Sequence, residues 1–307
     1  MLPDKIHFSK LNSAGNDFIC LDNTTGRFAR LFEDSRATSV FARFLCRRGL
    51  AVGADGLIVA NQVDDGNSAT IVARFLEPDG SEARLCGNGA ACFAYWSISE
   101  NLVPGPEVTM ITRAGTAQGR LIAENSPTET RVCIPKPTNI EPDIRLETEG
   151  RTWILTKVDI GVPHAIAYVE DLENMEVNHW GALIRHHPRF QPHGVNANFV
   201  QLGEPGKLAI RTFEFGVENE TLACGTGSAA AAIVSCLQKR WGEFYHDCEK
   251  SVEVLTRGGD RLKIWFTVEN QREVDNVCME SHVRPVYQAT LRPEFHRELE
   301  DRLAARE

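Results

Sequence analysis

The sequence predicts a mixed α/β (α+β) protein built from two pseudo-equivalent domains. The motif LCGNGAACF around Cys86 returns as ACGTGSAAA around Cys224. Two further landmarks recur in the same order: GADG at 53–56 and VTMITRAG at 108–115 are followed by GVNA at 194–197 and VEVLTRGG at 252–259. Each pair is separated by roughly 140 residues, which indicates one duplicated unit rather than the short period of a solenoid.

Length supports two domains, because 307 residues exceed the usual size of a single hydrophobic core. We read the Pro-rich run 135–142 as a connection and place the crossover near residue 120. The N-terminal domain is then expected to comprise 1–120 with about 275–307 and to carry Cys86, and the C-terminal domain 121–274 to carry Cys224. The cleft between the domains is the expected place for the two thiols to meet.

Hydrophobic periodicity supports both element types. Residues 35–48 place five apolar side chains on one helical stripe, with Gly49 as the C-terminal stop. The small and apolar residues after each Cys-Gly-x-Gly predict a helix that follows a tight turn, the second one at 227–238. Strict alternation at 261–268 predicts a strand with one buried face. The charged tail 293–307 is expected to form a solvated helix without a catalytic part.

Composition excludes several classes of partner. The net charge of −9 argues against nucleic acid and against an anionic membrane surface. The N-terminus lacks a signal-peptide pattern and no stretch is long enough to span a membrane, so a cytoplasmic protein is expected. His186, His187 and His193 have no Cys or carboxylate at ligand spacing, so no metal is predicted.

The cysteine count fits a reducing compartment. Nine cysteines without the spacing of a disulfide framework suit a pair that must stay as thiols. Apart from Cys86 and Cys224, we read the cysteines as small buried hydrophobic residues: Cys20, Cys46, Cys92, Cys133, Cys236, Cys248 and Cys278.

The two Cys-Gly-x-Gly motifs carry the chemistry. A helix N-terminus offers backbone N–H groups and a partial positive charge, so it binds a carboxylate and lowers the pKa of a cysteine placed there. With both effects present twice, a thiolate can remove a proton from one face of an α-carbon while a thiol returns one to the other face. The product has the inverted configuration.

The longer motifs resemble one known family. FSKLNSAGNDF, GADGL, PDGSEARLCGNGAACF, GVPH, GVNANFVQ and ETLACGTGSAAAAI are similar, in order and up to about Leu291, to the diaminopimelate epimerase family. The resemblance implies an amino-acid racemase or epimerase that needs no cofactor, acts on a small amino-acid substrate and wraps each domain's sheet around a central helix. A homodimer is compatible with the sequence, which does not fix the oligomeric state.

The resemblance also assigns roles to individual residues. Cys86 and Cys224 fall on the family's acid/base pair, and His164 and Glu214 on the polar residues that assist proton transfer. Asn16 and Asn196 fall on asparagines that contact the substrate, and Gly87, Asn88, Gly225 and Thr226 fall on the backbone cradle for its α-carboxylate.

The chain departs from the family where the distal end of the substrate is held. Phe215 stands in place of an arginine, and Glu77 and Val162 stand in place of asparagines. Without the guanidinium a second carboxylate loses its bidentate partner, while Glu77 and Phe215 suit a basic or aromatic side chain. We therefore predict such a substrate, with histidine first, unless another basic residue such as Arg211 or Arg74 takes the arginine's place.

Two alternatives accompany this prediction. The first is diaminopimelate epimerase activity itself, which feeds lysine and peptidoglycan synthesis. The second belongs to another class, a non-catalytic amino-acid binder or thiol redox protein. That reading requires the loss of an acid/base group, and the sequence retains both cysteines.

Overall fold

The computed structural model describes residues 2–63, 69–122, 128–239, 241, 249–269 and 273–305. The chain divides into two compact units. Unit 1 comprises Met1–Val132 and His282–Glu307, and unit 2 comprises Cys133–Ser281. The strand β17, Glu273–Thr290, contributes to both, since it pairs with β16 through its first half and with β1 through its second.

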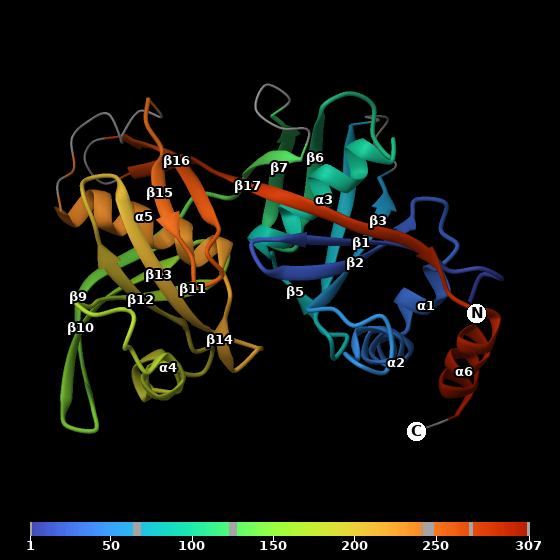
Figure 1. The fold of residues 1–307 in the computed structure, drawn as a ribbon, viewed down its shortest axis with the longest axis horizontal. Coiled ribbons are helices and arrows are strands. Elements are labelled where there is room, and N and C mark those ends of the chain that lie inside the picture. The colour runs from blue at the N-terminus through green and yellow to red at the C-terminus, as the bar shows by residue number, and fades with distance from the viewer. Residues whose placement is uncertain are drawn as a thin grey trace. The chain divides into compact units, whose positions relative to one another are not determined.

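Unit 1 is built mainly of strands around one long helix (Figure 1). Its elements are β1 His7–Ser13, β2 Asn16–Asn23, α1 Ala29–Glu33, α2 Ser35–Cys46, β3 Gly56–Gln62, β4 Thr70–Leu76, β5 Glu82–Ala83, α3 Gly87–Ser99, β6 Glu107–Thr112, β7 Gly115–Leu121, β8 Glu129–Cys133 and α6 Pro293–Ala304. The strand β8 ends on the first residue of unit 2.

Unit 2 has the same character. Its elements are β9 Thr138–Thr148, β10 Arg151–Asp159, β11 Pro163–Tyr168, α4 Val177–Arg185, the short 3-10 helix η1 Pro188–Phe190, β12 Asn196–Leu202, β13 Lys207–Glu214, β14 Asn219–Thr221, α5 Gly225–Lys239, β15 Val252–Leu255 and β16 Arg261–Glu269.

The strand pairing repeats between the units. In unit 1, β1–β2 is antiparallel, β2–β3 parallel, β3–β4 antiparallel, β4–β6 parallel and β6–β7 antiparallel. In unit 2, β10–β11, β11–β12, β12–β13, β13–β15 and β15–β16 follow the same series of directions. The predicted duplication is therefore confirmed by topology as well as by motif.

Each unit wraps its strands around one helix, as Figure 1 shows for α3 and α5. The helix α3 packs against β1, β2, β3, β4, β6 and β7, and α5 against β10, β11, β12, β13, β15 and β16. Residues 87–94 of α3 and 225–236 of α5 are all buried. Glycine and alanine at these positions let the strands approach on every side, as a helix without a polar face requires.

The predicted helix at 35–48 is confirmed as α2, which is capped by the Asp34 carboxylate and ends at Cys46. The predicted strand at 261–268 is confirmed as β16. The tail helix α6 is more than a solvated helix, because Leu299 is fully buried and Phe295 stacks on Phe44 with ring centroids 4.5 Å apart. One apolar stripe on an otherwise charged helix is enough to dock it onto α2.

Two other predictions need correction in unit 2. The run 135–142 is not wholly a connection, since β9 begins at Thr138 and pairs with β10. Cys133 and Cys278 are not free buried thiols but form a disulfide. The Ile134 N–H donates to the Val277 carbonyl, so paired backbones bring together two cysteines that sequence spacing could not connect. Cys248 lies outside the described residues.

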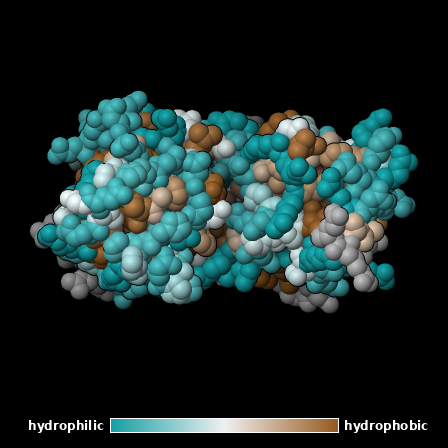
Figure 2. All heavy atoms as spheres, turned by 90° about the horizontal axis from the view of Figure 1, so that it is seen from below, coloured by the Kyte–Doolittle hydropathy of each residue, from teal (hydrophilic) through white to brown (hydrophobic). Residues whose placement is uncertain are grey.

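The surface contrasts with these cores. Figure 2 shows a face on which hydrophilic residues predominate and hydrophobic ones form small, scattered patches, the ordinary pattern for a protein exposed to water. Among the helices of the described ranges, none combines the length and the apolar character needed to cross a membrane.

Candidate active site

The first motif places Cys86 at the N-cap of α3. Its backbone is extended (φ −118°, ψ 120°), and its carbonyl accepts from the Ala90 N–H at 2.7 Å. The Cys86 Sγ accepts from the Gly89 N–H at 3.4 Å. The sulfur therefore lies at the positive end of a thirteen-residue helix, where the backbone N–H groups favour the thiolate over the thiol.

A polar network begins in the first turn of α3 and joins two predicted substrate contacts, Asn88 and Asn16. The Asn88 amide donates to Asn16 Oδ1 at 2.7 Å, and the Asn16 amide donates to Asp55 Oδ2 at 3.3 Å. The Arg48 guanidinium lies 2.7 Å from Asp55 Oδ1. Sequence reasoning gave Asp55 no firm role, although GADG aligns it with Asn196 of GVNA. The structure shows that it orients Asn16.

The charges of this network are balanced within unit 1. Burial raises the pKa of Asp17, but hydrogen bonds from Arg48 and Lys10 outweigh that effect and hold the pKa below its ordinary value. Lys10 is itself buried, with its Nζ 2.7 Å from Asp17 Oδ2. These pairs fix the strand that carries Asn16.

Glu77 lies in the turn after β4. Its N–H donates to the Ser81 carbonyl at 2.8 Å. Burial, followed by the charges of Asp79 and Asp55, raises the pKa of Glu77 to about 7. The Glu77 carboxyl is therefore partly protonated at neutral pH.

The second motif repeats the geometry in unit 2. The Cys224 carbonyl accepts from the Ser228 N–H at 2.9 Å, so Cys224 stands where Cys86 stands in unit 1. Its Sγ is 3.6 Å from Thr226 Oγ1, and the residue is buried. Gly227 is required at the first turn, because a Cβ there would lie 2.5 Å from Asn198 Oδ1.

His164 supports this thiol through a neutral network. Its Nε2 lies 3.0 Å from Thr226 Oγ1, and its Nδ1 lies 3.2 Å from the Asn198 amide nitrogen. That nitrogen also donates to the carbonyls of Ala165 and Asn196, which fixes it as the donor. We therefore assign the imidazole proton to Nε2, with Nδ1 as the acceptor.

The protonation state of His164 follows from its burial. Burial lowers the pKa of His164 to about 3, against the smaller opposing effect of Asn198, so the ring is neutral near pH 7. With Nε2–H donating to Thr226, the threonine hydroxyl can donate onward to the Cys224 sulfur. This relay stabilises a thiolate without placing a charge beside it. Sequence reasoning missed Asn198, although GVNANFVQ carries it two residues after Asn196 on the same face of β12.

Glu214, Phe215 and Val162 lie on neighbouring segments of unit 2. Glu214 ends β13, and its Oε2 accepts from Thr221 Oγ1 at 2.9 Å. The Phe215 N–H donates to Asn196 Oδ1 at 2.7 Å, so residue 215 adjoins a predicted substrate contact. The Val162 carbonyl accepts from the Ile160 N–H in the turn that leads into His164.

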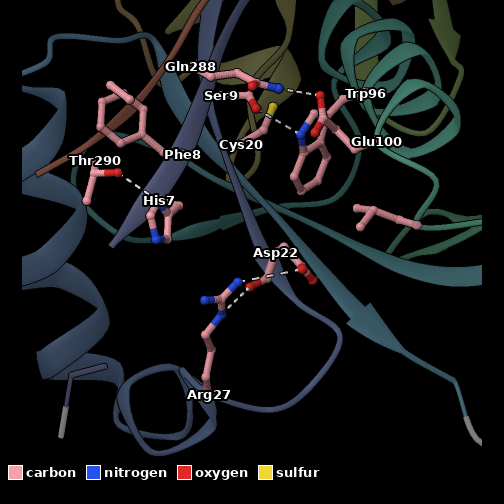
Figure 3. A pocket seen from close by; sticks show the side chains of 12 residues that line it. His7, Phe8, Ser9, Cys20, Asp22, Arg27, Trp96, Glu100, Gln288 and Thr290 are labelled. Atoms are coloured by element: carbon pink, nitrogen blue, oxygen red, sulfur yellow. Dashed lines mark hydrogen bonds and ion pairs between the residues drawn. The ribbon is translucent and has the colours of Figure 1, made fainter. Parts of the chain in front are cut away.

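A separate pocket of about 480 Å³ opens in unit 1 between β1, β17 and the end of α3 (Figure 3). Its polar groups bond to one another: Trp96 donates to Ser9, Gln288 to Glu100, and Arg27 pairs with Asp22. None of the predicted site residues lines it. Within the described ranges, no group of three or more His, Cys, Asp or Glu side chains is arranged to hold a metal ion.

Four further cysteines behave as packing residues. Cys20, Cys46, Cys92 and Cys236 are buried. Burial raises the pKa of Cys46 and of Cys236 to about 12, and it raises the pKa of Cys20 and Cys92 as well. The reading of these four as hydrophobic residues is confirmed, and they provide matched controls for Cys86 and Cys224.

Comparison with known proteins decides the family. The family model described as diaminopimelate epimerase matches residues 8–132 and 156–281. The chain belongs to the diaminopimelate epimerase family. The two matched segments fall one in each half of the duplication, and each contains one of the Cys-Gly-x-Gly motifs.

Curated relatives agree over most of the chain. The diaminopimelate epimerase of Aquifex aeolicus is 36% identical over 270 residues, which cover 88% of this chain and 92% of the relative. That of Methanothrix thermoacetophila is 37% identical over 273 residues, which cover 87% and 91%. The chain is thus an isomerase of the epimerase class.

Solved structures show the same fold at low identity. A hydroxyproline epimerase from Agrobacterium vitis, with bound trans-4-hydroxy-L-proline, aligns with a TM-score of 0.71 at 14% identity, covering 94% of this chain and 92% of that one. A phenazine biosynthesis protein of the PhzF family from Bacillus anthracis aligns with a TM-score of 0.71 at 15% identity, covering 94% and 99%. At these identities the likeness establishes the fold alone.

Proposed function

We propose that this chain epimerises diaminopimelate without a cofactor, using Cys86 and Cys224 as its acid/base pair. The observation that carries the proposal is the repeated position of the two sulfurs, each at the start of a buried helix in one copy of a duplicated fold. The curated relatives support diaminopimelate as the substrate. They give no support to histidine, which Phe215 and Glu77 led us to expect, so diaminopimelate is the better-supported substrate.

The chemistry follows from the two helix starts. N–H groups at Gly87–Asn88 and Gly225–Thr226 are the expected cradle for the α-carboxylate, and they stabilise the negative charge that develops when the α-proton leaves. One sulfur, as thiolate, takes that proton from Cα and becomes a thiol. The other sulfur, as thiol, donates its proton to the opposite face and becomes a thiolate.

The supporting groups differ in what they do. The relay from His164 through Thr226 donates to the Cys224 sulfur and so favours its thiolate. Asn16 and Asn196 are the proposed substrate contacts, each held in place by a hydrogen bond within its own unit. Glu214 is proposed to assist proton transfer from the end of β13.

The test is incubation of LL-diaminopimelate with the pure protein in deuterated water. We expect inversion at one α-carbon together with incorporation of solvent deuterium at that position. Chiral chromatography measures the inversion, and NMR measures the deuterium. Cys86→Ala and Cys224→Ala should each lower the rate of inversion at least about 1,000-fold, as loss of a group that acts in concert with another does.

Cys92→Ala on α3 and Cys236→Ala on α5 are the matched controls, because each removes a buried thiol from the same helix as a proposed catalytic one. Both should retain ordinary rates of inversion. Full activity in either Cys86→Ala or Cys224→Ala would contradict the two-base mechanism. Turnover of histidine in preference to diaminopimelate would contradict the substrate. Binding of diaminopimelate without any α-proton exchange would instead indicate a non-catalytic binder.

A further inference from the structure

Diaminopimelate presents a second amino-acid group, and its carboxylate needs a cation that residue 215 does not supply. The two substitutes considered from sequence are both committed elsewhere. Arg211 lies 2.6 and 2.8 Å from the two oxygens of Glu220, and Arg74 lies 3.2 and 3.1 Å from those of Glu82. A bidentate pair of this kind leaves a guanidinium little capacity for a ligand.

Arg185 is a different case. It is the last residue of α4, and its guanidinium carbon stands 4.3 Å from the centroid of the Phe215 ring. Its Nε and Nη2 are both 3.2 Å from one oxygen of Glu218. No described residue accepts a hydrogen bond from its Nη1. The guanidinium is thus held from one side by a single carboxylate oxygen and from another by an aromatic face.

The chain makes room for this side chain at Gly194. This residue has φ +71°, and a Cβ added to it would lie 1.6 Å from Arg185 Nη1. Two residues later, Asn196 accepts from the Phe215 N–H at 2.7 Å. Arg185, Phe215 and Asn196 therefore form one continuous wall of unit 2, which adjoins Glu214 at the end of β13.

The partner of Arg185 is the more exposed member of the ion pair. The Glu218 side chain is 41% exposed, whereas that of Arg185 is 9% exposed. Because the Glu218 carboxylate is the exposed member of the pair, a ligand that arrives from solvent can compete with it for the guanidinium. A ligand carboxylate that binds the guanidinium through both of its oxygens would replace the contact with a single Glu218 oxygen by a stronger, bidentate one.

We infer that Arg185, steadied by the Phe215 ring, binds the distal carboxylate of the substrate and takes over the role of the absent arginine. The inference rests on the proposed function. Phe215 then acts as a support for a cation instead of a platform for an aromatic substrate. An apolar residue at position 215 is then compatible with a substrate that has a second carboxylate, as the names of the relatives imply.

The test compares two substrates that differ only in the distal carboxylate. L-lysine has the carbon chain of diaminopimelate without its second carboxylate. Rates of α-deuterium exchange are measured for both, with L-lysine used as a competitive inhibitor where its own exchange is too slow. Arg185→Gln should lower kcat/KM for diaminopimelate roughly 100-fold, mainly through KM, and leave the rate or inhibition constant of L-lysine within about twofold.

Three further variants separate recognition from structure. Arg189→Gln, which removes an exposed arginine paired with Glu141, should change kcat/KM for neither substrate. Arg185→Gln with Phe215→Arg should recover at least tenfold of the lost kcat/KM. Glu218→Gln, which removes the competing carboxylate, should lower KM for diaminopimelate and keeps the test open if Arg185→Gln fails to fold.

The outcomes are distinct. Equal losses for diaminopimelate and L-lysine in Arg185→Gln, or a higher KM in Glu218→Gln, would show that Arg185 has only a structural role. A wild-type protein that exchanges the α-proton of L-lysine as well as that of diaminopimelate would overturn the inference while leaving the epimerase mechanism standing. A wild-type protein that exchanges neither would overturn the proposed function, and this inference with it.

Discussion

Cys86 and Cys224 occupy the same position in two copies of one fold but lie in different chemical surroundings. Cys86 is partly exposed, and its neighbours Asn88 and Asn16 lead to the charged groups Asp55 and Arg48. Cys224 is buried, and Thr226 links it to a neutral His164. Duplication kept the cysteine at the helix start, while the residues behind it diverged.

This difference shows which features the chemistry requires twice. In the proposed two-base mechanism each sulfur must exist as thiolate in one direction of the reaction, which accounts for the recurrence of the helix N-terminus and its glycines. Position 88 in unit 1 and position 226 in unit 2 lie at equivalent places in the motif, yet Asn88 bonds to Asn16 and Thr226 to His164. We therefore expect the two sites to respond differently to mutation and to pH.

The largest expected effect within this comparison is at Thr226. Thr226→Val removes the hydroxyl between His164 and Cys224 without changing shape, so kcat for diaminopimelate should fall roughly 100-fold with KM little changed. Thr226→Ser, which keeps the hydroxyl, should retain most of the wild-type kcat. The measurement is initial-rate kinetics in both reaction directions.

Ser228→Ala is the matched control for Thr226→Val, since Ser228 donates to the carbonyl of Cys224 on the same helical turn rather than to its sulfur. It should retain wild-type kcat. If Thr226→Val were equally active, the relay would have no catalytic role, and the two thiol sites would differ only in burial.

The repeats in the sequence were sufficient to predict the duplicated fold, because glycine turns and small-residue helices are local features. Cys86 and Cys224 were singled out for the same reason. What the sequence did not reveal depends on tertiary pairing: the Cys133–Cys278 disulfide joins residues 145 positions apart. The contact between Arg185 and Phe215 was not predicted either, since nothing local to α4 indicates that this side chain reaches the Phe215 ring.

The burial of Leu299 is a second feature that depends on tertiary contacts and not on local sequence. Charge along 293–307 suggested a solvated helix, and only contact with α2 shows which stripe is covered. Asn198 was overlooked although it lies within a motif that was recognised, because its role depends on the position of His164 on the adjacent strand β11. Local patterns thus indicated the position of the two cysteines at helix starts better than they indicated the groups that contact them.

The next effect concerns acid stability and should be confined to unit 2. The pKa of His164 is about 3 in the folded protein and 6.5 as its ordinary value. Below pH 6.5 the unfolded chain therefore binds a proton that the folded chain does not, so stability falls by about 1.4 kcal/mol per pH unit until pH 3 is approached. His164→Gln should remove that part of the decline.

Hydrogen–deuterium exchange by mass spectrometry at pH 7.0, 5.5 and 4.5 can follow the two central helices separately, after correction for intrinsic exchange rates. In the wild type, peptides from α5 should lose protection with acid, and in His164→Gln they should lose less. An unchanged acid response of α5 in the variant would show that His164 is not buried as a neutral ring.

The smallest expected effect has the opposite sign and belongs to unit 1. The pKa of Glu77 is raised from 4.5 to about 7, chiefly by burial, so between these values the unfolded chain releases a proton that the folded chain retains. Stability therefore rises as pH falls from 7 to 4.5, in contrast to the effect of His164 over much of the same range. The side chain is only partly buried, so the change should stay below the limiting slope of about 1.4 kcal/mol per pH unit.

Glu77→Gln should abolish this rise in the protection of α3 peptides, while Glu107→Gln, at an exposed position of the same unit, should not. If acid reduced the protection of α3 and α5 peptides in parallel, in the wild type and in Glu77→Gln alike, Glu77 would have no such effect on stability. The two cysteine sites would then not differ in how protonation of their neighbours affects stability.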